Sequence, residues 1–158
     1  MHVRVGLPNR ITVEVVERTP VIAWFQSDAM TWIDTEGIAF QPLCEVSGLV
    51  QVVATGTPLD VQNDLDLPSY EQQFIAPDVV QIIINMAPYV PSGMPMAYDP
   101  KYGIGWQDPR GWSVYFGQST QDMSMKVTIY QALVERLVSQ GIQPSVISME
   151  YLDAPFYK

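Results

Sequence analysis

Short runs of alternating apolar and polar residues are the feature that most constrains the fold of this chain. From Arg10 to Glu17, branched apolar residues fall on one face of an extended chain, and Thr12 and Glu14 fall on the other. A period of two is the pattern of a half-buried strand. The strand-like segment Val3–Val5 comes before it, across the turn residues Gly6–Asn9. The sequence therefore predicts a hairpin at the start of the chain.

Further runs of this kind, each bounded by turn residues, extend along the chain. The runs up to Phe40 follow one another closely, which predicts a meander of short antiparallel strands. Gly56–Gln73 is rich in Asp, Pro, Ser and Gln and is interpreted as a surface loop. The predicted strands after the first hairpin are Val21–Gln26, Met30–Ile33, Ile38–Phe40, Leu49–Thr55, Met96–Tyr98, Gly103–Gln107, Trp112–Phe116 and Val146–Leu152.

Two segments have helical rather than strand periodicity. Pro77–Ala87 carries apolar residues at helical spacing, begins with a residue suited to the first helical turn and is closed by Pro88. A longer helix follows Ser119 and Asp122, which have capping-box spacing, and ends at Gly141. The expected fold class is α+β: a mixed, largely antiparallel sheet with two helices on one side, preceded by the N-terminal hairpin.

Composition limits the range of functions. The 158 residues suit one domain, and 47% hydrophobic with 16% charged residues is typical of a folded globular chain. The net charge is −9, and the 8 Lys and Arg residues are scattered singly. Nucleic acid and anionic lipid need clustered cations, so both are disfavoured as partners. The most apolar stretch, Val79–Val90, is shorter than the roughly 20 residues of a bilayer span, and the N-terminus lacks a signal-peptide core, so the chain as given is expected to be soluble.

Residue types that carry common catalytic chemistry are scarce. His2 is the only histidine and lies beside the chain start, which favours an exposed residue over a general base. Cys44 is the only cysteine, so neither an intramolecular disulfide nor a multi-cysteine metal site can form. Without a second histidine to activate it, Cys44 is expected to be a small buried hydrophobe. We expect no metal and no cofactor.

Carboxylates and tryptophans are the remaining candidates. A glycosidase-like pair needs only two facing acids, but most acids here fall in predicted turns, which turn chemistry explains. The Asp60–Asp66 cluster lacks the ligand order of an EF-hand loop. All four tryptophans fall in predicted strands, which favours core packing over a sugar platform. The tryptophans are Trp24, Trp32, Trp106 and Trp112, and the turn acids are Asp28, Asp34, Glu36, Asp60, Asp64, Asp66, Asp99 and Asp108.

An ordered series of motifs is more specific than any of these features. The segment Glu17-Arg18-Thr19-Pro20-Val21-Ile22-Ala23-Trp24, followed by Trp32-Ile33-Asp34-Thr35-Glu36-Gly37-Ile38-Ala39-Phe40, resembles the Glu-Arg-x-Pro-x-Ala and Asp-x-x-Gly-x-x-Phe signatures of the bacterial cell-division protein family FtsQ, called DivIB in Gram-positive bacteria. Further segments occur in the family's order, and the similarity runs from about Val3 to Tyr157. They are Val46–Leu49, Trp112–Gly117, Lys126 with Val127, and Ile147–Tyr151.

The resemblance implies a domain organisation and a location. Residues 1–18 would be the C-terminal hairpin of a truncated POTRA domain, and residues 19–158 the β-domain that follows it in the family. The full-length protein would carry one N-terminal transmembrane helix that is absent here. The domain would then lie on the extracytoplasmic side of a bacterial cell membrane, at the division septum.

The resemblance also implies a function without catalysis. Family members are scaffolds that recruit the coiled-coil proteins FtsB (DivIC) and FtsL and so help control septal peptidoglycan synthesis. The expected mode is strand addition to a free edge of the last strand, where unpaired N–H and C=O groups accept an incoming segment. The residues so implied are Val146, Ile147, Ser148, Met149, Glu150, Tyr151, Leu152 and Asp153, with Lys101 and Tyr102 near the same surface.

One position departs from the family pattern, and two other functions stay open. Glu150 stands where the family often has Arg, which indicates a partner that is basic at that point. One alternative is a POTRA-like module of an outer-membrane assembly or secretion protein, which would show further hairpin repeats upstream. The other is a carboxylate-pair hydrolase, which needs two of the turn acids to converge in a deep pocket.

Overall fold

The computed structural model describes residues 2–6, 10–14, 17–58, 61, 68, 71–119 and 121–158, of which 2–6 and 10–14 are described by their backbone alone. Strands β1 (His2–Gly6) and β2 (Arg10–Glu14) pair antiparallel in a two-stranded sheet of their own. This confirms the N-terminal hairpin. Its assignment to a POTRA domain stays a prediction.

A mixed sheet of nine strands forms the rest of the fold, in the order β11-β10-β9-β8-β7-β6-β3-β4-β5. The pairs β3–β6, β6–β7 and β9–β10 are parallel, and the other neighbours are antiparallel, so the sheet is mixed and largely antiparallel, which confirms the predicted fold class. The predicted meander holds for β3–β4–β5 alone, because the first hairpin is separate and β6 returns parallel to β3. The strands are β3 (Ile22–Gln26), β4 (Ala29–Ile33), β5 (Ala39–Phe40), β6 (Val50–Ala54), β7 (Met96–Asp99), β8 (Gly103–Gln107), β9 (Ser113–Tyr115), β10 (Val146–Ser148) and β11 (Phe156–Tyr157).

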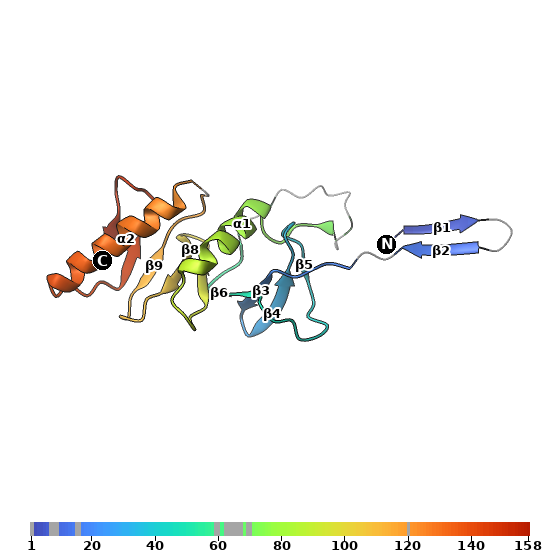
Figure 1. Cartoon of the computed structure of the whole chain (residues 1–158), viewed down its shortest axis with the longest axis horizontal. Coiled ribbons are helices and arrows are strands. Elements are labelled where there is room, and N and C mark those ends of the chain that lie inside the picture. The colour runs from blue at the N-terminus through green and yellow to red at the C-terminus, as the bar shows by residue number, and fades with distance from the viewer. Residues whose placement is uncertain are drawn as a thin grey trace.

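Two α-helices cover one face of this sheet (Figure 1). Helix α1 (Pro77–Met86) continues into the short 3-10 helix η2 (Ala87–Tyr89), and α2 (Met123–Ser139) packs nearer the C-terminal strands. The expected capping box is wrong: Asp122 at the N-cap has φ 57° and makes no side-chain cap bond, and Ser119 Oγ instead accepts from Gln121 N. Gly141, with φ +67°, follows the end of α2 as predicted.

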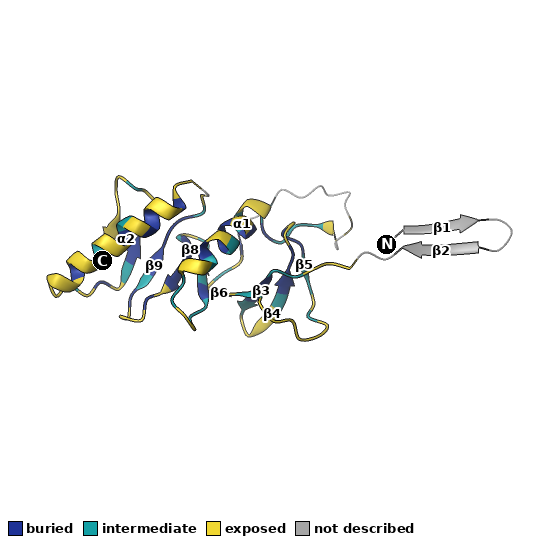
Figure 2. Ribbon diagram, viewed as in Figure 1, coloured by how far each residue is buried: buried dark blue, intermediate teal, exposed yellow. Residues whose placement is uncertain are grey.

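The core lies between the helices and the sheet, as the buried positions in Figure 2 show. Its centre is a cross-strand row of side chains that passes through six strands, each residue opposite the next, and every member is at most 2% exposed. All four tryptophans are also buried, which confirms the core-packing prediction. The row is Trp24, Val52, Met96, Trp106, Val114 and Ile147.

The β5 end of the sheet is closed by backbone contacts. Ile38 forms an antiparallel bridge with Gln73, and the Gly37 carbonyl accepts hydrogen bonds from the backbone N–H groups of Phe74 and Ile75. A Cβ at Gly37 would lie 1.9 Å from the Ile75 carbonyl oxygen, so only glycine allows this approach. Segment 73–75 thus covers the start of the β5 edge.

Cys44 corrects a prediction. It is exposed rather than buried, because it lies on the irregular segment between β5 and β6, where loop backbone stays on the surface. In the part of the chain that the structure describes, no helix has the length and apolar character needed to cross a membrane.

Candidate functional site

The last predicted strand is shorter than expected, and its edge is not free. Strand β10 spans Val146–Ser148 rather than Val146–Leu152, and it lies between β9 on one side and β11 on the other. The expectation that residues 146–153 present a free edge is therefore wrong, because the chain turns at residues 150–154 and folds back onto β10. The exposed edge at this end of the sheet belongs to β11 (Phe156–Tyr157).

The hydrogen-bond register shows which groups β11 leaves open. Val146 and Lys158 exchange both backbone hydrogen bonds, and Tyr157 lies opposite Ile147. In an antiparallel ladder, hydrogen-bonded and non-hydrogen-bonded pairs alternate, so the N–H and C=O of Tyr157 point away from β10. Pro155 has no N–H to add to this edge. The free edge is short, with one donor and acceptor pair at Tyr157.

Aromatic side chains gather near this edge. Tyr157 continues the core row beyond Ile147 but is 46% exposed, whereas Ile147 is fully buried. Phe156 is also 46% exposed, and Tyr151, in the loop before β11, is 62% exposed. Sequence reasoning missed Phe156 and Tyr157, although two adjacent aromatics after Asp153-Ala154-Pro155 are a short strand signal.

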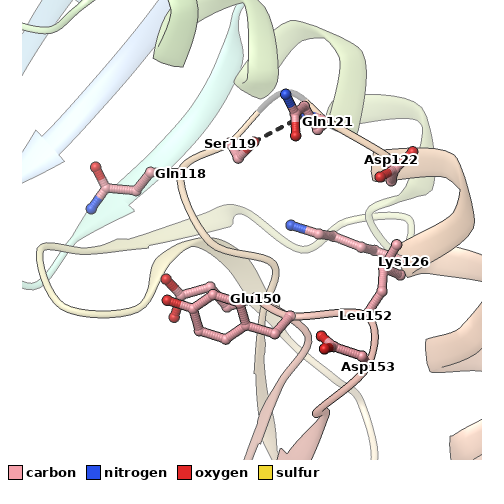
Figure 3. Close-up of a pocket in the computed structure, with 9 residues that line it drawn as sticks. Gln118, Ser119, Gln121, Asp122, Lys126, Glu150, Leu152 and Asp153 are labelled. Atoms are coloured by element: carbon pink, nitrogen blue, oxygen red, sulfur yellow. Dashed lines mark hydrogen bonds between the residues drawn. The ribbon is translucent and has the colours of Figure 1, made fainter.

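A cavity of about 540 Å³ lies between the start of α2 and the loop that follows β10. We call it the C-terminal groove. Figure 3 shows the Lys126 side chain extending from α2 into it, with Ser119 and Gln121 on one side and Glu150 on the other. The groove is lined by Gln118, Ser119, Gln121, Asp122, Lys126, Glu150, Tyr151, Leu152 and Asp153.

The charges in the C-terminal groove are unbalanced. It has three carboxylates, Asp122, Glu150 and Asp153, against the single ammonium of Lys126. Lys126 is 4% exposed and its Nζ donates to the Phe116 carbonyl oxygen at 2.9 Å. Among the described residues, no cation lies within 4.0 Å of the three carboxylates. Burial lowers the pKa of Lys126 below its ordinary value, and the nearby Glu150 and Asp122 charges partly offset that effect.

An apolar strip on α2 continues from this groove. Asp122, Lys126, Ile129 and Leu133 follow one another at helical spacing, so they share one side of the helix. Ile129 and Leu133 are only partly buried against the core. The side of α2 that begins in the C-terminal groove therefore presents half-buried apolar side chains.

The ten residues that the resemblance implied fall into three settings. Val146, Ile147 and Ser148 are in β10, and Met149 is fully buried. Residues 150–153 line the C-terminal groove. Lys101 and Tyr102 form the turn between β7 and β8, where their backbone N–H groups donate to Asp99 Oδ1 at 2.9 and 3.1 Å.

This turn is connected to the C-terminal groove. Tyr102 stacks on Tyr115 with ring centroids 5.4 Å apart, and the Tyr115 carbonyl oxygen accepts from Met149 N at 2.7 Å. Gln118 Nε2, at the rim of the groove, donates to the Pro100 carbonyl oxygen at 3.2 Å. The structure thus brings the β7–β8 turn and the loop after β10 to the same end of the sheet.

A buried hydrogen-bond network fixes α2 to the sheet. Trp112 Nε1 donates to Tyr130 Oη at 3.0 Å, and Tyr130 Oη donates to Asp108 Oδ2 at 2.6 Å. Burial, together with this bond to Asp108, raises the pKa of Tyr130 far above its usual value. Burial by itself would raise the pKa of Asp108, but hydrogen bonds from Tyr130 and Arg110 outweigh it and lower that pKa. The network fixes α2 to the segment between β8 and β9.

The turn acids act in their own turns. Asp34, Asp99 and Asp108 each accept backbone N–H groups within two to four residues, as turn chemistry predicts. Asp60, Asp64 and Asp66 lie outside the described residues. Within the described ranges, no group of three or more His, Cys, Asp or Glu residues could hold a metal ion.

Comparison with known proteins adds no assignment. No protein-family model matches the chain, and no curated protein matches its sequence.

Proposed function

We propose that this domain is a scaffold of the bacterial division machinery that binds FtsB (DivIC) and FtsL by strand addition to β11. The observation that carries the proposal is the outward-facing N–H and C=O of Tyr157 on an edge strand flanked by exposed aromatics. The proposal keeps the mode of binding that the resemblance implies and moves it from β10 to the strand beside it.

The exposed side chains of β11 favour burial by a partner over exposure to solvent. Natural proteins protect exposed edges with charges, prolines or very short strands, and β11 follows Pro155 and is two residues long. However, Phe156 and Tyr157 remain 46% exposed there. Aromatic side chains with a polar tip are favoured at protein interfaces, because they bury a large apolar area. A short guest strand would bury these rings and satisfy the Tyr157 backbone.

The two motifs that carry the resemblance contact each other in the structure. Arg18 Nη1 lies 2.6 Å from Asp34 Oδ2, so the Glu-Arg-x-Pro and Asp-x-x-Gly-x-x-Phe segments meet in an ion pair. Gly37 in the second motif allows the close approach of Ile75. Residues 16 positions apart in the sequence thus form one contact, which supports treating the two motifs as a unit.

Mixing the domain with the FtsB and FtsL ectodomains of the same organism tests the proposal. Co-elution in size-exclusion chromatography is expected, and Tyr157→Pro should abolish it because proline removes the outward N–H and disfavours the pairing geometry. Tyr151→Asp should also abolish it with an unchanged circular dichroism spectrum. Tyr89→Asp is a matched control, since Tyr89 is 46% exposed on η2 and should leave co-elution intact. Failure of the wild-type domain to co-elute at high concentration, or full binding by Tyr157→Pro, would refute strand addition at β11.

A further inference from the structure

We infer that the guest of β11 is an extended segment with an apolar residue opposite Tyr157 and a basic residue, Arg above all, that enters the C-terminal groove. This inference rests on the proposed strand addition and specifies the chemistry of the partner. It combines three observations: the open backbone pair at Tyr157, the half-buried strip on α2, and the unpaired carboxylates beside the loop.

The ladder register determines where the apolar residue lies. A guest residue that exchanges hydrogen bonds with Tyr157 places its side chain on the same face of the sheet as Tyr157. That face is the helix-covered one, because Tyr157 lies opposite Ile147 in the core row. Ile129 and Leu133 of α2 are half-buried where they pack against the core on this face. An aliphatic or aromatic guest side chain would therefore extend the core row by one strand.

The negative charge of the C-terminal groove favours the basic residue of the guest. The loop that lines the C-terminal groove ends at Asp153, two residues before Pro155, so we expect a guest strand that extends from Tyr157 past Pro155 to approach the groove. Three carboxylates against one ammonium leave two excess negative charges there. The Lys126 ammonium donates to the Phe116 carbonyl and forms no ion pair within 4.0 Å among the described residues. An incoming cation is favoured at this position, and an incoming carboxylate is repelled.

The arrangement favours a long side chain over a metal ion. The carboxylates do not form a cluster that could hold a metal within the described residues. A guanidinium group on a flexible stem can reach separated carboxylates and stack on an exposed ring such as Tyr151. The net charge of −9 further attracts a basic partner over longer range.

A random library of displayed 12-residue peptides, selected on the wild-type domain after depletion on Tyr157→Pro, tests the inference. The selected peptides should combine alternating apolar residues with Arg or Lys near one end. Replacing that Arg with Glu in a synthetic peptide should weaken binding to the wild-type domain about tenfold or more. The groove variant Glu150→Gln with Asp153→Asn should lose most of the preference for Arg over Glu. The matched control Asp78→Asn with Glu135→Gln changes the net charge equally at two exposed helix positions and should retain it.

The outcomes separate the two proposals. If Tyr157-dependent peptides show no basic preference, or if both charge variants reduce it equally, the basic guest is refuted and strand addition stands. If no Tyr157-dependent peptide emerges, both ideas are overturned. Retention of the Arg preference in the control variant together with its loss in the groove variant supports the inference.

Discussion

The two edge strands of the nine-stranded sheet, β5 and β11, differ in whether other parts of the chain cover their backbone groups. At β5, segment 73–75 folds over the edge, and the Gly37 carbonyl accepts two backbone hydrogen bonds at 2.8 and 3.2 Å. At β11, the N–H and C=O of Tyr157 point outward beside side chains that are about half exposed. The start of the first edge is covered by this chain itself, whereas the second offers its groups to another molecule.

The two ends also differ in what holds them. The closed edge depends on close backbone packing at Gly37, while the strands that lead to the open edge are covered by α2, whose Tyr130 bonds to Asp108 between β8 and β9. A binding edge needs such support, because a pre-organised strand loses less conformational entropy when a guest arrives. Substitutions at the closed edge should therefore affect stability, and substitutions at the open edge should affect binding.

Gly37→Ala should give the largest loss of stability. Its φ of +79° disfavours a side chain, and the new Cβ would lie 1.9 Å from the Ile75 carbonyl oxygen, so the segment covering β5 must move. We expect a loss of about 3–5 kcal/mol in the free energy of unfolding by urea denaturation. Gly93→Ala is the control, because Gly93 has φ +81° with nothing within 4 Å of a Cβ, and it should cost only about 1 kcal/mol. Equal losses in the two variants would mean that the close approach at Gly37 is unimportant.

Tyr130→Phe should give the next largest loss. It removes the donor 2.6 Å from the buried Asp108 carboxylate and the acceptor of the Trp112 indole, so two buried polar groups lose a partner. We expect about 2–3 kcal/mol by the same measurement. Tyr157→Phe deletes a hydroxyl from a half-exposed ring and should change stability by less than about 0.5 kcal/mol. A neutral Tyr130→Phe would show that α2 is held by apolar packing alone.

Arg18→Ala should have a smaller effect. The Arg18 side chain is 32% exposed, so solvent screens its ion pair with Asp34, and Asp34 keeps two backbone donors at 2.9 and 3.0 Å. We expect a loss of about 1 kcal/mol, reduced at high salt. Arg136→Ala, at an exposed position on α2, serves as the control for a lost cation. A loss that does not change with salt would argue for packing of the Arg18 stem instead of charge.

Tyr157→Lys should change stability least while removing binding. Tyr157 is 46% exposed, and lysine tolerates an edge strand, so the free energy of unfolding should shift by at most about 0.5 kcal/mol. Phe40→Lys at the closed edge is the variant for comparison. The Phe40 ring packs edge-on against Trp32 with ring centroids 6.1 Å apart, so we expect this variant to lose about 1–2 kcal/mol in the free energy of unfolding. If Tyr157→Lys destabilises the domain as much as Phe40→Lys, the contrast between the two edges is lost.

Local patterns predicted most of the elements but not their neighbours. The period-two runs and the two helical stretches anticipated the strands and helices to within a few residues, because alternation and capping are local properties. The capping box at Ser119 failed because Asp122 adopts a left-handed backbone that the residue types do not reveal. Cys44 was expected inside because its residue type is usually buried, and its loop position decided otherwise.

Only part of the candidate site could be predicted from the sequence. Residues 150–153 were singled out and do line the C-terminal groove, but Phe156 and Tyr157 were missed. The opposite wall of the groove was missed as well; it consists of Gln118, Ser119, Gln121, Asp122 and Lys126. A turn such as Asp153-Ala154-Pro155 shows that the chain bends and not onto which strand it returns. The edge strand was consequently placed one position too early in the sheet.

The sequence by itself determined the α+β class, the hairpin, the core tryptophans and the acidic balance, because residue types and their spacing set burial and local conformation. Only the tertiary structure decided the parallel pairings, the strand that covers β10, and the gathering of Asp122, Glu150 and Asp153 around Lys126. These features depend on contacts between residues far apart in the chain, where many pairings satisfy the same local pattern and the packing of the whole core selects one.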